Sequence, residues 1–250
     1  MERIKSLFDG LHYEAPTSSP ARDVFSPFRE APLDRPFVVA QIGQSLDGRI
    51  ATSSGESRDI SGAAALDHLH RIRAHVDAVV VGRATIVADD PKLTVRRIKG
   101  KNPARVVIDP SGRLDVEGKW LANDGARRIL ISAAQIEPPA GVELIQLAAH
   151  DGYIAPAAMI EALFARGLRR LLIEGGARTI AGFIEAGCVD RLHALVAPMI
   201  IGSGRQGLDL APISKLEFAL RPRTEVHLLS DGDVLFDCDF VNCRRYSSQN

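Results

Sequence analysis

The fold of this 250-residue chain is constrained most by the regular alternation of short apolar runs with helix-like segments. Runs such as Phe37–Gly43 and Val79–Val81 are typical of buried strands, whereas Gly62–His75 and Ala155–Gly167 have the residue pattern of helices. The alternation ends near Pro198, and only strand-like runs follow. Alternating strands and helices are typical of a parallel sheet covered by helices. The sequence therefore predicts an α/β domain with a mainly parallel central sheet and antiparallel C-terminal strands.

The remaining elements follow the same logic. Ser61 is the expected N-cap of the first long helix, in which Leu66, Leu69, Ile72 and Val76 form one apolar face. A further helix is expected at 177–187. The other strand candidates are residues 77–82, 104–109, 127–132, 142–147, 169–176, 191–201, 225–230 and 234–240.

Charge and composition exclude several classes of partner. Lys plus Arg and Asp plus Glu number 31 each, so no net field favours nucleic acid or an anionic membrane. No run approaches the ~18 apolar residues of a membrane span. The three cysteines, Cys188, Cys238 and Cys243, form no CxxC motif and leave an odd count. We therefore expect neither a disulfide framework nor a zinc site, and a reducing cytoplasm fits best.

The N-terminal segment differs in composition from the rest of the chain. Residues 1–35 are rich in proline and contain Thr17-Ser18-Ser19, which indicates an extended arm or leader that packs on the surface. We expect one folded domain at residues 36–245.

Two glycine turns lie where an open α/β sheet binds its ligands, beyond the carboxyl ends of strands. Gly82 ends one strand and is followed by Thr85 and Asp89, whereas Gly175-Gly176 follow the strand that ends at Glu174. Arg178 and Thr179 then fall in the first turn of a helix, whose N-terminus suits a phosphate. Such turns also occur without a ligand, but two of them with charged neighbours favour nucleotide binding.

The remaining motifs give weaker evidence for a function. "GSGRQG" at 202–207 has the letters of a dinucleotide fingerprint, but Pro212 follows where a helix should continue, so a loop is expected. The basic residues Arg96, Arg97, Lys99 and Lys101 are either a solvated loop or a phosphate clamp. The histidines are scattered and predict no site, and no HExxH, G-x-S-x-G or P-loop motif occurs.

Taken in order, the strings "AQIGQSLDGRIA", "HRIRAHVDAVVVGRATIVADDPKLTVR", "NPARVVIDPSGR" and "LLIEGGARTIAGFIEAG" resemble the pyrimidine reductases of riboflavin biosynthesis. The resemblance covers roughly residues 35–207. It implies a dihydrofolate-reductase-like fold with helices on both faces of the sheet. It also implies NADPH-dependent reduction of a ribosylaminopyrimidine(di)one 5′-phosphate to its ribitylamino form, and a homodimer. The zinc motif of a fused deaminase is absent, which favours a monofunctional protein.

The resemblance also assigns residues to roles. Expected catalytic residues are Glu174 and Asp89. Expected cofactor contacts are Gly43, Asp59, Gly82, Thr85, Asp89, Asp109, Gly175, Gly176, Arg178 and Thr179. Expected substrate contacts are Gln41, Ser57, Arg73, Leu93, Arg96 and Glu174.

Two positions depart from the family pattern. Many bacterial members have lysine where Gln41 stands, and many have tryptophan near Asp59. Glutamine carries no charge and does not readily donate a proton. Two alternatives therefore stay open: an NADPH-dependent reductase of a pterin or other heterocycle, and a non-catalytic NADP(H)-binding protein.

Overall fold

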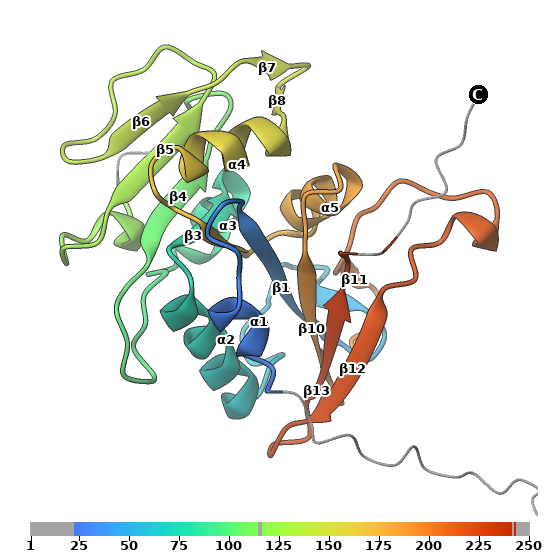
Figure 1. Ribbon diagram of the computed structural model, residues 1–250. Coiled ribbons are helices and arrows are strands. Elements are labelled where there is room, and N and C mark those ends of the chain that lie inside the picture. The colour runs from blue at the N-terminus through green and yellow to red at the C-terminus, as the bar shows by residue number, and fades with distance from the viewer. Residues whose placement is uncertain (1–22, 115–116, 242, 244–250) are drawn as a thin grey trace, which may run out of the picture.

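The structure is a computed structural model that describes residues 23–114, 117–241 and 243. Its centre is a nine-stranded sheet in the order β12-β13-β10-β1-β9-β3-β4-β5-β6 (Figure 1). Neighbouring strands from β10 to β6 are all parallel, whereas β13 is antiparallel to both β10 and β12. The predicted sheet is therefore confirmed. Its strands are β1 (Phe37–Ser45), β3 (Ala78–Gly82), β4 (Ala104–Ile108), β5 (Arg128–Ser132), β6 (Glu143–Gln146), β9 (Arg170–Ile173), β10 (Arg191–Ala197), β12 (Arg223–Leu228) and β13 (Val234–Asp239).

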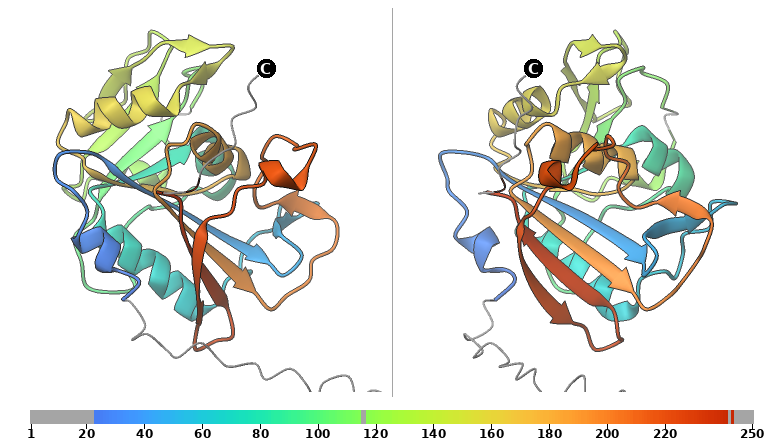
Figure 2. Two further views of the ribbon diagram at one scale, coloured as in Figure 1. Left: turned by 45° about the vertical axis from the view of Figure 1, so that its right-hand side comes forward. Right: turned by 90° about the vertical axis from the view of Figure 1, so that its right-hand side faces the viewer.

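Helices cover both faces of this sheet (Figures 1 and 2). Side chains along β1 alternate between two cores: Val38 packs with α4 and α5, whereas Val39 packs with α1, α2 and α3. This alternation follows from the two-residue period of a strand, and it lets both faces of the sheet be buried. The helices are α1 (Ser26–Arg29), α2 (Ala63–His75), α3 (Arg83–Asp89), α4 (Pro156–Phe164) and α5 (Ala177–Glu185).

Short elements complete the fold. β2 (Arg49–Thr52) pairs with β11 (Gly204–Gln206), and β7 (Ala149–His150) pairs with β8 (Tyr153–Ile154). Two 3₁₀ turns lie at Lys119–Leu121 and Leu216–Phe218. The loop expected at 202–207 is thus partly a strand, because Gly204 packs against the carbonyl of Ala51 in β2. No helix begins in that segment, so it is not a dinucleotide fingerprint.

Helix α2 differs from the prediction at its start and along its buried face. Its N-cap is Gly62 and not Ser61, and the cap is supplied from a distant turn. Asp233 accepts a hydrogen bond from the Gly62 amide at 2.9 Å, and Asp231 accepts one from the Ala64 amide at 2.7 Å. Sequence reading misses these caps because the two aspartates lie far along the chain, between β12 and β13.

The apolar face predicted for α2 is only partly correct. Leu66 is exposed, whereas His68, His70 and Arg73 are buried along with Ile72. A helix that buries three polar side chains needs polar partners beneath it, because unpaired polar groups are costly in a core.

The described part of the N-terminal segment packs closely on the domain. Phe28 in α1 is 1% exposed and belongs to the core beneath α2. Its ring lies 5.7 Å from that of Phe37 and 5.8 Å from that of His193, measured between ring centroids. Residues 23–29 therefore contribute to the folded core and are not only a surface covering.

No helix among the described residues is both long and apolar enough to cross a membrane.

Candidate active site

The two glycine turns lie side by side at the carboxyl edge of the sheet. β3 and β9 are neighbouring parallel strands, so both chains reverse at the same edge. The Gly176 amide donates a hydrogen bond to Thr85 Oγ1 at 3.0 Å, which joins the start of α5 to α3. A Cβ atom at Gly82 would stand 2.6 Å from Thr179 Oγ1. The two turns on which the nucleotide-binding interpretation depends therefore lie next to each other.

Gly175 is required by its backbone and by its neighbour. Its φ of +98° lies in a region that L side chains rarely adopt. A Cβ atom there would also collide with Thr85 Oγ1 and stand 3.1 Å from Thr85 Cβ. The turn is therefore packed tightly against Thr85, and only glycine fits at this position.

A buried ion pair stands next to these turns. Arg73 of α2 donates two parallel hydrogen bonds to Glu174, from Nε to Oε1 at 2.7 Å and from Nη2 to Oε2 at 2.6 Å. The side chains are 5% and 7% exposed. Burying two charges is costly, and paired, well-directed hydrogen bonds offset that cost. The family resemblance predicted both residues as substrate contacts, but it did not predict that they pair with each other.

Glu174 is one end of a polar row across the sheet face that α2 covers. Gln41 is the next residue of β1 after the pair of Ala40 with Ile173, just as Glu174 is the next residue after Ile173. Gln41 pairs with His193 on β10, and His193 pairs with Asp237 on β13. Gln41 is 8% exposed and His193 fully buried. Each of these polar residues lies within or directly after an apolar run, and this pattern was the sequence signal from which the row could have been found.

The histidines at one end of this row form a buried cluster that the sequence did not predict. His68 Nε2 lies 3.0 Å from His193 Nδ1, and His193 Nε2 lies 3.3 Å from Asp237 Oδ1. Burial and the charge of His193 lower the pKa of His68 to about 3. Asp237 also accepts a hydrogen bond from Arg191 Nε at 2.9 Å. These contacts explain the buried polar face of α2.

The segment after α3 runs along α2 and brings a second arginine toward the Arg73–Glu174 pair. Leu93 is buried with φ +54°, and Thr94 accepts a hydrogen bond from Arg73 Nη1 at 3.1 Å. Burial and the charge of Arg73 lower the pKa of Arg96, while Glu174 opposes that shift. Arg96, Arg73 and Glu174 therefore share one electrostatic environment.

Asp89 is the last residue of α3, the helix that begins directly after the Gly82 turn. Burial raises the pKa of its carboxyl group, and the charges of Arg205 and Arg58 partly offset this shift. A raised pKa makes proton donation easier near neutral pH, which is a property of general acids.

For four other predicted site residues, all within the described part of the chain, the structure shows burial and location but no hydrogen bond or ion pair with the Arg73–Glu174 pair. Ser57 is half-buried, Asp59 is exposed with φ +63°, and Arg178 is exposed in the first turn of α5. Gly43 lies in β1 against the Ser61 hydroxyl.

Asp109 does not reach the surface of the site. It is fully buried, and its oxygens accept hydrogen bonds from Ser111 Oγ at 3.0 Å and from the Leu114 amide at 2.6 Å. Its carboxylate holds the turn after β4 and leaves no exposed oxygen for a ligand. A cavity of about 280 Å³ lies beside it, lined also by Trp120, Leu130 and Ile136.

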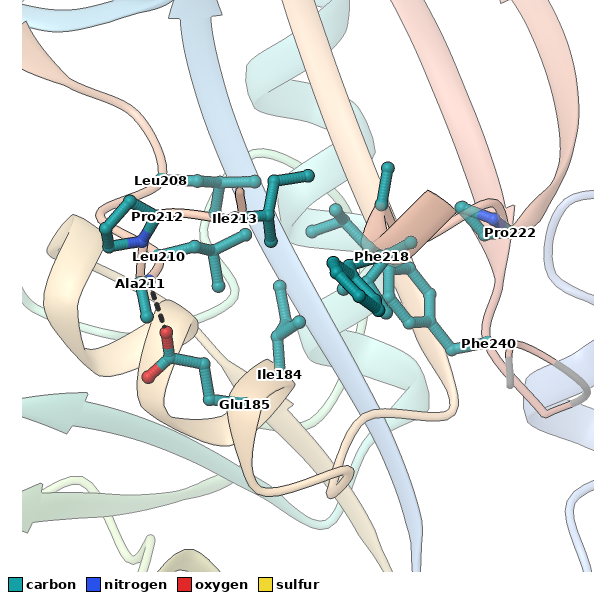
Figure 3. Close-up of a pocket in the computed structure, with 13 residues that line it drawn as sticks. Ile184, Glu185, Leu208, Leu210, Ala211, Pro212, Ile213, Phe218, Pro222 and Phe240 are labelled. Atoms are coloured by element: carbon teal, nitrogen blue, oxygen red, sulfur yellow. Dashed lines mark hydrogen bonds between the residues drawn. The ribbon is translucent and has the colours of Figure 1, made fainter. Parts of the chain in front are cut away.

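A larger hollow than this cavity lies elsewhere, on the α5 side of the sheet (Figure 3). Its volume is about 780 Å³, and none of the predicted site residues lines it. Glu185 accepts a hydrogen bond from the Ala211 amide at 2.6 Å across one wall. Apolar side chains form most of the remaining lining, and they include Ile184, Leu192, Leu208, Leu210, Phe218 and Phe240.

The glycine turns fit a phosphate-bearing cofactor. α5 begins at Ala177 without a side-chain cap. The Gly176 amide donates to Thr85 and the Thr179 amide to the Gly176 carbonyl, so the amides of Ala177 and Arg178 are the ones that remain available to a ligand. A Cβ at Gly175 or Gly82 would collide with the hydroxyl of Thr85 or Thr179, so only glycine fits at these two turns. These features suit the backbone approach of a pyrophosphate.

An open parallel sheet, two glycine turns at its carboxyl edge and a charged cluster beside them define an α/β domain of the class in which ligands gather at this edge. The chain belongs to the RibD C-terminal domain family, whose model matches residues 36–230. The family resemblance seen in the sequence is therefore confirmed.

Known relatives agree with this assignment. The chain is 34% identical over 197 residues to the 2,5-diamino-6-ribosylamino-4(3H)-pyrimidinone 5′-phosphate reductase of Methanothermobacter thermautotrophicus, covering 75% of this chain and 90% of that protein. It is 31% identical to the riboflavin biosynthesis protein RibD of Aquifex aeolicus, covering 81% of this chain and 58% of that protein. The crystal structure of Acinetobacter baumannii RibD has a TM-score of 0.71 at 28% identity, covering 82% and 58% of the two chains. The chain thus spans just over half the length of the RibD proteins.

Proposed function

We propose that this chain catalyses the NADPH-dependent reduction of a ribosylaminopyrimidine(di)one 5′-phosphate to its ribitylamino 5′-phosphate, a step of riboflavin biosynthesis. The observation that carries this proposal is the placement of the glycine turns beside the buried Arg73–Glu174 pair. One ligand held by the turns would face a second ligand held by the charged cluster. The named activity of the Methanothermobacter relative, which the chain matches over most of its length, supports the same conclusion.

The cofactor side consists of the two turns and their neighbours. Gly82, Thr85, Gly175 and Gly176 would lie against the dinucleotide, with the α5 amides directed at its phosphates. The other members of this set are Gly43, Asp59, Asp89, Arg178 and Thr179, while Asp109 would support the cofactor side through its loop. Bound NADPH supplies a hydride to C1′ of the opened sugar.

On the substrate side, Arg96 would bind the 5′-phosphate, because a guanidinium can bond two phosphate oxygens together. Glu174, held by Arg73, would accept hydrogen bonds from the amino groups of the pyrimidine, and Gln41 would lie beside it. Ser57 and Leu93 complete the predicted set. Asp89 would supply the proton to the ring-opened imine nitrogen, since burial raises its pKa.

The test is direct. Purified full-length protein is mixed with NADPH and the ribosylaminopyrimidine phosphate, in deaminated and non-deaminated form, and absorbance is followed at the nicotinamide band. Oxidation of NADPH with either form is the expected result. Turnover only with a pterin or another heterocycle, or NADPH binding without any turnover, would replace the proposal by one of the two alternatives.

Arg96→Ala is expected to raise KM for the phosphorylated substrate by about 30-fold, because a charge-assisted contact to phosphate is worth about 2 kcal/mol. The Kd of NADPH should change little. Lys99→Ala is the matched control, because it removes an exposed positive charge from the same basic segment. Steady-state kinetics and fluorescence titration provide the measurements. Equal effects of the two variants would contradict the assignment of Arg96.

We also propose a homodimer formed through the edge strand β12, in which Val226 and Leu228 are 59% and 77% exposed. An unpaired edge with exposed apolar side chains is a site for strand or face pairing. Leu228→Lys should convert the dimer to a monomer in multi-angle light scattering. Leu33→Lys, at a residue 73% exposed near α1, is the control and should leave the mass unchanged.

Two further proposals concern the bounds of the reductase domain and the cellular location of the protein. The reductase domain would span residues 36–245, since β1 begins at Phe37 and β13 ends at Asp239. The unpaired state of Cys188, Cys238 and Cys243 supports a reducing, cytoplasmic location.

A further inference from the structure

The loop at residues 94–97 is held along one side of α2 by contacts at three-residue spacing. Asp67, His70 and Arg73 follow one another at i, i+3 and i+6, so they lie along one side of the helix. Arg73 donates to the Thr94 carbonyl, His70 accepts from the Arg96 amide, and Asp67 pairs with Arg97. Each turn of α2 thus fixes a different residue of the loop.

His70 makes the contact at the centre of this arrangement. Its Nδ1 accepts the Arg96 amide hydrogen bond at 3.0 Å, and the residue is 2% exposed. To accept, Nδ1 must be unprotonated. Burial, with the charges of Arg73, Arg96 and Arg97, lowers the pKa of His70 to about 4, so the ring is neutral at pH 7. The hydrogen bond is therefore present under ordinary conditions.

The backbone of this loop is fixed at three consecutive residues, each by a side chain. Between Thr94 and Arg96, the Val95 amide donates to Asn102 Oδ1 at 2.8 Å. The guanidinium of Arg97 is committed to Asp67. Among the described residues, no hydrogen bond or ion pair engages the guanidinium of Arg96. The loop is thus rigid in its backbone and leaves one arginine side chain available.

We propose that His70 is a positioning residue that fixes the backbone of Arg96 and so directs its guanidinium to the 5′-phosphate of the substrate. This inference rests on the proposed function. Arginine has a long, flexible side chain, and fixing its backbone reduces the conformational freedom lost when phosphate binds. His70 therefore acts through Arg96 and does not itself contact the substrate.

The test uses two substitutions that differ in whether an acceptor remains. In His70→Asn, the side-chain oxygen stands as many bonds from Cα as Nδ1 does in histidine, so it can still accept from the Arg96 amide. In His70→Leu no acceptor remains. We expect His70→Leu to raise KM for the phosphorylated substrate by about tenfold, with kcat retained within about threefold, because the hydrogen bond that holds Arg96 in place for phosphate is worth about 1.4 kcal/mol. His70→Asn should stay within about threefold of the wild type.

A substrate without the 5′-phosphate distinguishes loss of Arg96 positioning from a general loss of folding or activity. With the dephosphorylated substrate, wild type and His70→Leu should have the same kcat/KM, since Arg96 then has no phosphate to bind. His68→Leu, a buried histidine of the same helix that contacts His193 instead of the loop, is the matched control. It should lower thermal stability without changing the dependence on phosphate. Equal loss by His70→Leu on both substrates would overturn the inference and leave His70 a purely structural residue.

Amide hydrogen exchange makes the test independent of turnover. Protection of the Arg96 amide should be lost in His70→Leu and kept in His70→Asn, in the full-length protein without ligand. Unchanged protection in His70→Leu would overturn the inference whatever the kinetics show. If the wild type oxidises no NADPH with either pyrimidine, the proposed function fails, and the substrate half of this inference fails with it. The exchange data would then still decide whether His70 holds the loop.

Discussion

Replacing Glu174 by glutamine is expected to lower kcat/KM of the reduction by about 100- to 1000-fold, a loss typical of removing a charged positioning group from an active site. The amide of glutamine keeps one acceptor oxygen but presents hydrogen-bond donors to Arg73. Arg73 would then be left as a buried charge without its partner, in a side chain only 5% exposed. The guanidinium would shift, and the surface offered to the pyrimidine would change with it.

The same substitution should lower the free energy of unfolding by about 3 kcal/mol, since removing one partner of a buried pair leaves an uncompensated charge. For a chain of this length the melting temperature would fall by about 10 °C. Calorimetry and steady-state kinetics at a temperature where both proteins are folded measure the two effects separately. NADPH affinity should stay within about threefold of the wild type, because the substitution leaves the glycines of the proposed cofactor turns unchanged.

Asp237→Asn is the matched control for Glu174→Gln. Asp237 also pairs with a buried arginine, Arg191 at 2.6 Å, and its side chain is 3% exposed. It lies within β13, away from the glycine turns, so its loss should cost comparable stability without comparable loss of turnover. If the two variants lose stability alike and both retain kcat/KM within about tenfold, Glu174 is structural only, and the substrate site proposed here is wrong.

The sheet and its carboxyl edge could be predicted from the sequence because they depend on local patterns. Apolar runs such as Val79–Val81 and the glycines after them are legible within a few residues. Chain alternation then fixes which ends of the strands meet. That both turns lie at one edge followed from those two facts. That β9 is the neighbour of β3 did not follow from them, and the hydrogen bond from Gly176 to Thr85 shows that the two turns are adjacent.

What sequence reading missed were contacts between residues far apart in the chain. The pairing of Arg73 with Glu174, and the cluster of His68, His193 and Asp237, join segments separated by dozens of residues or more. Spacing on one helix shows which side chains share a face, but not which strand residues they meet. Asp109 shows the converse limit. Its position at a strand end predicted a cofactor contact, but its hydrogen bonds within its own loop were not visible in the sequence.

Gly175→Ala is expected to weaken NADPH binding by about 100-fold, because the turn cannot keep its shape with a side chain present. At φ +98° an alanine is strained, which costs about 1–2 kcal/mol in itself. Its Cβ would also collide with Thr85 Oγ1, the atom that accepts the Gly176 amide. Relief of that collision must move either the turn or α3, and both are proposed to contact the cofactor.

Gly167→Ala separates the effect of backbone strain from the effect of the collision with Thr85. Gly167 has a comparable φ of +81°, but a Cβ there meets nothing within 4 Å. It should show the cost of backbone strain in thermal unfolding and leave the Kd of NADPH unchanged. Thr85→Ala removes the colliding hydroxyl, so the double variant should bind NADPH better than the product of the single effects predicts. Strictly additive effects in this cycle would mean that the contact between Gly175 and Thr85 does not shape the cofactor site. Fluorescence titration of NADPH against the four proteins decides between the two outcomes.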